Sequence, residues 1–232
     1  MDGIIENIAP GKRFLLCLDE FERLQEVIAV INSRAPLNFL RHIIQDRNTW
    51  TLLFSGSHTL DEIETYWSDY LINTRSVRIS YLETSEAAEL IKYPVPEFPD
   101  IYLPETVERI IYWTRCQPFL VQLLCSELVE YLNRTYGQNS LNIKATPNHV
   151  DAIFDQALSV GRPYFNELWT NTLNQEQREY IRKLVKGEDI AVKEYKKIEN
   201  KLIEKEIIKR EEDKISFQVP LIERSIKQKI QE

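Results

Sequence analysis

The sequence predicts an α/β unit, then a helical unit, then a third unit that combines helices with a β-hairpin. Three observations predict this order. Short apolar runs alternate with amphipathic helical segments in the first part of the chain, four prolines lie within the eleven residues from Pro94 to Pro104, and two short alternating runs follow helical segments near the end. Alternating strands and helices favour a parallel sheet, and clustered prolines mark a boundary between elements.

Three strands are predicted in the first unit. Residues 14–18 (FLLCL) form a continuous apolar run, which is typical of a strand buried on both faces of a parallel sheet. Residues 50–56 (WTLLFSG) and 77–82 (VRISYL) are the next two strands. The helices predicted between them span residues 20–33, about 37–44 and about 61–72.

The second unit is predicted to be helical. Apolar residues at helical spacing predict one helix around Val107–Ile111 and another over Phe119–Leu132. A third helix is expected over about 147–158, with Thr146 as its N-cap and Pro147 at its first position. The predicted domains are residues 1–95, 96–160 and 161–232.

The third unit has the pattern of a winged helix-turn-helix. Asn174 begins a helix that ends at Gly187, and a second helix covers about 192–205. Two short alternating runs follow, at 207–210 and 215–219, and the segment EEDK separates them. This spacing is a hairpin signature, and helices followed by a two-stranded wing predict the winged fold.

Composition limits the class of protein. The formal net charge is −7, divided as 14 − 22 = −8 over residues 1–165 and 15 − 14 = +1 over residues 166–232. An acidic main body argues against broad nucleic-acid binding by the whole chain. Three cysteines without CxxC spacing and three histidines argue against a disulfide framework and a zinc site. Without a long apolar run or a signal peptide, we expect a cytoplasmic protein with no membrane segment.

Asp19 and Glu20 directly follow the first predicted strand. A carboxylate at the C-terminal end of a buried parallel strand lies where α/β sheets bind ligands. In P-loop nucleoside triphosphatases an acidic residue there holds magnesium, and a neighbouring Glu polarises the attacking water. The pair therefore predicts Asp19 as the metal residue and Glu20 as the base. The alternative is a helix whose first turn carries acidic side chains that interact with its dipole.

Four segments carry a resemblance to a known family. They are FLLCLDEFERL at 14–24, LLFSGSH at 52–58, YLETSEAAELIKYPV at 81–95 and TRCQPFLVQLLCSELVEYLN at 114–133. In this order they resemble the AAA-like ATPases of bacteria, and in particular their STAND-related branch. The resemblance extends through FNELW at 165–169 into the winged tail. It implies a partial P-loop NTPase parallel sheet, a helical lid subdomain and a C-terminal winged helix-turn-helix, with ATP and Mg²⁺ as cofactors.

The resemblance also implies roles for individual residues. Asp19 and Glu20 occupy the Walker B position. Ser55 and Ser57 fall in the sensor 1 region, where a side chain reports on the terminal phosphate. The alternative for Ser55-Gly56-Ser57 is an ordinary turn or helix cap.

The lid of the family begins with a Thr-Gly-Gly-Gln-Pro-like segment, whose proline lies near the nucleotide base. Here the segment is Thr114-Arg115-Cys116-Gln117-Pro118. Pro118 matches, and its alternative role is to begin a helix. Arg115 and Cys116 replace glycines, and their side chains restrict both positive φ and close approach of a ligand.

The phosphate loop is the larger departure from the family. No Gly-x4-Gly-Lys-Ser/Thr motif is present: Gly11-Lys12 is followed by Arg13, and Glu6 stands where the first glycine should be. Catalytic carboxylates without a cradle for the phosphates are expected to bind ATP poorly and to hydrolyse it hardly at all.

In the family a strand, the phosphate loop and a long helix precede the Walker B strand. We therefore expect the C-terminal part of an ATP-binding AAA-like or STAND regulatory ATPase, inactive alone, which binds ATP or ADP when a phosphate loop is supplied. A protein partner is also expected. The alternative is a non-catalytic protein-interaction or DNA-binding regulator that retains the ATPase scaffold.

Charges of both signs alternate near the second helix of the winged unit. The lysines are Lys193, Lys196, Lys197 and Lys201, and the glutamates are Glu194, Glu199, Glu204 and Glu206. A solvated helix with i,i+4 charge pairs explains such a pattern without DNA. We therefore expect DNA binding by this unit to be weak and salt-sensitive at most.

Overall fold

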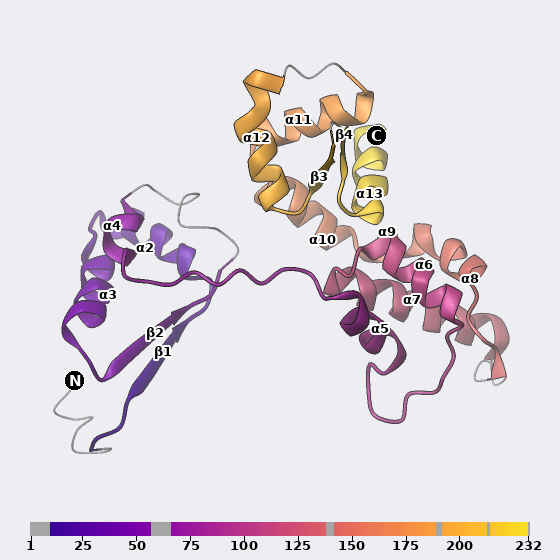
Figure 1. Ribbon diagram of the computed structural model, residues 1–232, viewed down its shortest axis with the longest axis horizontal. Coiled ribbons are helices and arrows are strands. Elements are labelled where there is room, and N and C mark those ends of the chain that lie inside the picture. Colours follow the sequence, from indigo (N-terminus) through magenta and orange to yellow (C-terminus); the bar gives the residue numbers. More distant parts are fainter. Residues whose placement is uncertain (1–9, 57–65, 138–141, 189–191, 213, 232) are drawn as a thin grey trace. The chain divides into compact units, whose positions relative to one another are not determined.

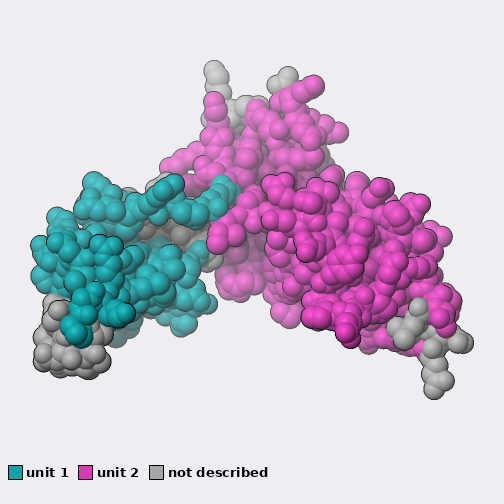
Figure 2. All heavy atoms as spheres, turned by 60° about the horizontal axis from the view of Figure 1, so that its bottom comes forward, with its two compact units in different colours: residues 1–78 teal, residues 79–232 magenta. Residues whose placement is uncertain are grey.

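The computed structural model describes residues 10–56, 66–137, 142–188, 192–212 and 214–231, and the chain forms two compact units, Met1–Arg78 and Ile79–Glu232 (Figures 1 and 2). Over the described residues the fold is a mostly helical α/β one. It contains twelve α-helices, a two-stranded parallel sheet early in the chain and an antiparallel hairpin near the C-terminus.

The parallel sheet belongs to the first unit. Strand β1 (Phe14–Leu18) pairs with β2 (Trp50–Phe54), in a register that runs from Phe14 opposite Trp50 to Leu18 opposite Phe54. The two strands point the same way, so both carboxyl ends meet at one edge (Figure 1). The prediction of these two strands and of their parallel pairing is confirmed.

The helices of the first unit cover one face of this sheet (Figure 1). They are the 3₁₀ turn η1 (Phe21–Arg23), α2 (Leu24–Ile31), α3 (Ala35–Asp46) and α4 (Trp67–Leu71). Phe21 is central to their core, because its ring lies 5.6 Å from that of Phe54 and 5.8 Å from that of Trp67. Of the helix predicted at 61–72, residues 61–65 lie outside the described part of the chain.

The opposite face of the sheet departs from the prediction of strands buried on both faces. Leu15 and Leu53 are 61% and 55% exposed, whereas Leu18 and Leu52 pack against the helical core. Burial alternates along both strands because the described helices of this unit pack on the same side.

The prediction of a third strand at residues 77–82 is wrong. Residues 77–82 form neither a strand nor a helix, and Val77 and Ile79 are 77% and 92% exposed. A strand needs a neighbour to accept its backbone hydrogen bonds, and none of the described segments pairs with this one. The segment ends with the Leu82 N–H donating to the Cys116 carbonyl at 3.1 Å.

The second unit begins with helices. They are α5 (Thr84–Lys92), α6 (Pro104–Thr114), α7 (Pro118–Tyr136), α8 (Pro147–Ala152) and α9 (Phe154–Val160). The prolines between α5 and α6 interrupt helix as predicted, and Thr146 caps α8 in a capping box. The single helix expected over 147–158 is divided into α8 and α9 at Ile153. Helix α5 was not predicted from the sequence.

The hairpin and its helices complete the second unit. They are α10 (Arg162–Glu167), the π-helical turn η3 (Leu168–Thr172), α11 (Gln175–Lys186), α12 (Val192–Glu204), β3 (Ile208–Glu211), β4 (Lys214–Phe217) and α13 (Pro220–Gln231). Strands β3 and β4 pair antiparallel, and Asn174 caps α11 as predicted. Helices α10 and α13 were not predicted.

One hydrophobic core runs through this unit, from Ile91 in α5 to Ile226 in α13. Helices on both sides of the boundary expected at residue 160 contribute to it. The division into residues 1–95, 96–160 and 161–232 stays a prediction. Over the described residues, no helix is both long and apolar enough to cross a bilayer.

Candidate carboxylate site

Asp19 and Ser55 meet at the carboxyl edge of the parallel sheet. Asp19 follows β1 and Ser55 follows β2, and the Ser55 hydroxyl donates to Asp19 Oδ1 at 2.7 Å. The Ser55 N–H also donates to the Leu18 carbonyl at 3.0 Å, which extends the strand pairing to the site. The structure therefore brings together two of the predicted site residues, 36 positions apart in the sequence.

Glu20 is held beside Asp19 in a strained backbone conformation. Its φ and ψ are 47° and 45°, in the left-handed region that costs a non-glycine residue about 1–2 kcal/mol. The Glu20 N–H donates to Asp19 Oδ1 at 3.0 Å. The Glu20 carboxylate is exposed and forms a 3.4 Å ion pair with Arg23, an interaction worth at most about 1 kcal/mol at a surface. It is therefore free to exchange that partner for water or a ligand.

Gly56 is the last described residue after β2 and lies against Glu22. A Cβ on residue 56 would lie 2.9 Å from Cδ of Glu22, too close for a larger residue without a shift. The Phe21 N–H donates to the Ser55 carbonyl at 3.1 Å, so the backbone after β2 is joined to the segment that follows β1. Ser57 lies outside the described residues.

The predicted lid segment lies in the second unit. Arg115 and Cys116 both adopt positive φ, 48° and 65°, so the backbone keeps the conformation that glycines would favour. The side chains of these two residues were expected to restrict positive φ. The backbone adopts it nevertheless, at a cost in strain. The Gln117 side chain caps α7 by accepting the Leu120 N–H at 2.6 Å, and Pro118 is the first residue of that helix. This geometry accounts for Pro118 as a helix start.

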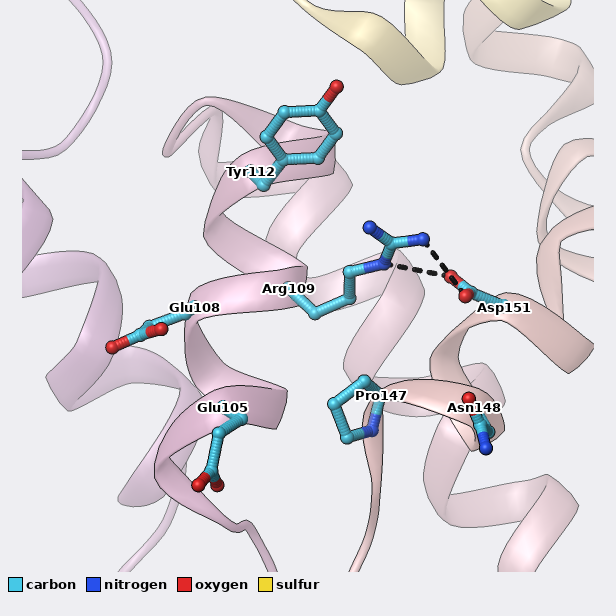
Figure 3. A pocket seen from close by; sticks show the side chains of 7 residues that line it. All are labelled: Glu105, Glu108, Arg109, Tyr112, Pro147, Asn148 and Asp151. Carbon is cyan, nitrogen blue, oxygen red and sulfur yellow. Dashed lines mark hydrogen bonds and ion pairs between the residues drawn. The ribbon is translucent and has the colours of Figure 1, made fainter.

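A cavity of about 460 Å³ lies between α6 and α8, and the sequence analysis did not single it out (Figure 3). Arg109 forms two hydrogen bonds of 2.9 Å to Asp151 across it, and these bonds raise the pKa of Arg109. Glu108 points away from that pair. Asp151 comes from α8 and Arg109 from α6, so only the fold pairs them, and no local sequence signal indicates the pair.

The donor set at the carboxylate edge suits a hard cation. Oδ1 of Asp19 accepts two hydrogen bonds, which leaves Oδ2 of this exposed carboxylate for another partner. Mg²⁺ is commonly held by one or two carboxylates together with water and phosphate oxygens, so a single Asp fits it. Over the described residues, no group of three or more His, Cys, Asp or Glu is placed to hold a metal ion by itself.

Comparison with protein-family models and with curated protein sequences gives no match for this chain. The chemistry of the site is therefore inferred from its own residues.

Proposed function

We propose that this chain provides the carboxylate edge of a nucleoside-triphosphate site in an AAA-like or STAND-type regulatory ATPase. The hydrogen bond of 2.7 Å between Ser55 and Asp19 carries the proposal. It unites two polar side chains at the ends of neighbouring parallel strands, which is where α/β sheets bind ligands.

Each residue has a role that follows from its position. Asp19 would hold Mg²⁺ through its free oxygen, and the bound ion would neutralise charge on a phosphate group. Glu20 places a second, exposed carboxylate next to it, suited to accept a proton from water. Ser55 orients Asp19 and lies close enough to respond to a ligand there.

The phosphate-binding part of such a site does not fit the residues present. Gly11 has a positive φ of 70° and Lys12 is exposed, but Arg13 and β1 follow them instead of a Ser or Thr and a helix. In phosphate sites of this kind, the backbone N–H groups of a loop and of the first turn of the following helix bind the phosphate oxygens. We therefore propose that ATP or ADP binds only when another polypeptide segment supplies a phosphate loop, and that hydrolysis depends on the same segment.

Metal binding at Asp19 can be tested without turnover. Mn²⁺ replaces Mg²⁺ and broadens NMR signals of nearby nuclei, so titration of the ¹⁵N-labelled chain should broaden the amide signals of Asp19, Glu20 and Ser55 first. The variant Asp19→Asn should lose this selectivity. Broadening that is equal over the whole chain, or that centres on Glu105 and Glu108, would contradict the proposal.

A second candidate is a protein-interaction regulator that retains the ATPase scaffold without its chemistry. The observation that favours it is the apolar outer face of the sheet, where Leu15 and Leu53 are more than half exposed. Exposed apolar patches of this kind mark interaction sites. The Mn²⁺ titration separates the two candidates, because this alternative predicts no preferred metal site at Asp19.

A further inference from the structure

The charges of α12 are sorted by the fold into two faces, although they alternate in the sequence. Glu199 faces inward, with a side chain that is 3% exposed. It accepts a hydrogen bond of 2.8 Å from Nε of Arg210 in β3 and one of 3.4 Å from the Tyr180 hydroxyl in α11. Its negative charge is therefore neutralised inside the unit and does not offset lysines on the surface.

The outer face of α12 is basic. Lys196, Lys197 and Asn200 are exposed and Lys201 is half-buried. Over the described residues no ion pair involves any of these three lysines. Glu204 is the remaining acidic residue of the described side chains 195–204, and the outer face carries 3 − 1 = +2. The side chains of Lys193 and Glu194 lie outside the described part.

Glu206 lies beyond the end of α12 and is also engaged. Its carboxylate accepts the Ser80 hydroxyl, and its carbonyl accepts the Tyr81 hydroxyl at 3.4 Å. Two of the four glutamates that alternate with the lysines in the sequence, Glu199 and Glu206, are therefore engaged within the second unit.

Contacts with α11 and β3 hold α12 in place within the second unit. Lys183 of α11 donates to the Tyr195 hydroxyl at 2.8 Å and lies 4.8 Å from the centre of that ring. Leu202 is fully buried and Glu199 joins α12 to β3. The apolar side of α12 is thus used within the unit, so the helix has no free apolar face to insert into a membrane.

The described residues of the wing carry charges of both signs. Lys209 pairs with Glu211, and Arg210 pairs with the buried Glu199. Glu212 and Lys214 are both exposed near the tip and offset each other, so the larger excess of unpaired positive charge lies on α12.

We propose that the outer face of α12 binds the phosphate backbone of duplex DNA without sequence selectivity. From Lys196 to Lys201 the helix rises about 7.5 Å, and a duplex presents about four phosphate charges over that length. Three unpaired lysines can therefore contact phosphates together. The proposal is independent of nucleotide binding, because these residues lie in the second unit and the carboxylate site lies in the first.

The test measures binding of the full chain to a fluorescein-labelled DNA duplex of mixed sequence by fluorescence anisotropy, without nucleotide. Non-specific binding to DNA typically has a Kd of about 1–100 µM at physiological salt, and we expect a value in this range. Three phosphate contacts predict a fall in affinity of about 40-fold between about 50 and 200 mM salt. A second duplex of unrelated sequence should bind equally well.

The double variant Lys196→Ala/Lys197→Ala removes two of the three contacts. Its affinity should fall only about 3- to 4-fold over the same salt range, because one phosphate contact remains. The matched control is Lys12→Ala/Arg13→Ala, which removes two adjacent exposed charges from the first unit and should keep the 40-fold fall. Circular dichroism of both variants checks that the helices remain folded.

Three results would overturn the proposal. They are no anisotropy change at low salt, an unchanged salt dependence in the Lys196/Lys197 variant, or an equal loss in the Lys12/Arg13 control. Binding to vesicles that contain phosphatidylserine without binding to the duplex would also overturn it.

Discussion

The Ser55 hydroxyl and the Asp19 carboxylate are joined by a hydrogen bond of 2.7 Å at the ends of two parallel strands. The same Asp19 oxygen accepts the N–H of Glu20, so two donors fix the carboxylate before any ligand arrives. The two donors have different origins: Ser55 is brought to Asp19 by the register of β1 with β2, whereas the Glu20 N–H belongs to the turn that follows β1.

Removal of the Ser55 hydroxyl should weaken metal binding at Asp19. We expect Ser55→Ala to lower Mn²⁺ affinity by about 10-fold, as is usual when a residue that orients a metal ligand is lost. Ser55→Thr retains the hydroxyl and should bind nearly as the original chain does. Selective broadening of the Asp19 and Glu20 amide signals measures both. Equal affinities for the Ala and Thr variants would show that Ser55 has no orienting role.

The chain by itself should not hydrolyse ATP measurably in the presence of Mg²⁺. The carboxylates are present, but no Gly-x4-Gly-Lys-Ser/Thr segment holds the phosphates, and phosphoryl transfer depends mainly on that positioning. Release of inorganic phosphate is the measurement. Turnover that disappears in Glu20→Gln would refute the expectation, because it would show that Glu20 acts without such a loop.

Relief of backbone strain at Glu20 should stabilise the first unit. A glycine adopts the left-handed conformation of residue 20 without steric cost, whereas alanine retains that cost. We expect Glu20→Gly to be about 1 kcal/mol more stable than Glu20→Ala in chemical unfolding. If the alanine variant is the more stable one, residue 20 is not strained. Strain kept at a non-glycine residue beside Asp19 is consistent with selection for its carboxylate.

Local patterns predicted most of the helices and all four paired strands. The caps at Thr146 and Asn174 and the apolar run before Asp19 are signals that act over a few residues, and the structure confirms the elements they begin or end. The segment at 77–82 has the same strand-like composition but no neighbour among the described residues. A strand depends on a partner, and a local pattern does not show whether the partner exists.

The candidate site was also predicted only in part. The apolar run followed by Asp19 indicated the carboxyl edge of a sheet, and the family resemblance pointed to Ser55. Their contact became visible only with the parallel pairing of β1 and β2. The strain at Glu20 and the cavity at Arg109 were not predictable, since backbone angles and contacts between distant helices leave no local signal. The burial of Glu199 was also not predictable, because inward-facing and outward-facing charged residues of α12 follow one another along the sequence.

Removal of Glu199 should lower the stability of the second unit more than removal of an exposed ion pair in strand β3. Glu199→Ala leaves Arg210 without its carboxylate and removes the acceptor of the Tyr180 hydroxyl, so we expect a loss of about 1–3 kcal/mol in the free energy of unfolding. The control is Glu211→Ala, whose carboxylate pairs with Lys209 at the surface and whose loss should change the stability much less. Urea unfolding compares the two. Equal losses would mean that burial of Glu199 adds nothing.

Alkaline pH should destabilise the second unit through Cys125. Burial raises the pKa of this thiol from 9.0 to about 12, and its hydrogen bond with Tyr102 lowers it only in part. Above pH 9.0 the unfolded chain loses the thiol proton while the folded chain keeps it, so the contribution is complete below 9.0 and is lost as the pH rises toward 12. The loss should reach about 1 kcal/mol near pH 10. Unfolding curves at the two ends of this pH window measure the effect. Cys125→Ala should lose less unfolding free energy at alkaline pH than the original chain does.

The control is Cys17→Ala, which removes an exposed thiol and should keep the full alkaline loss. Identical pH dependence in both variants would assign the alkaline loss to other groups.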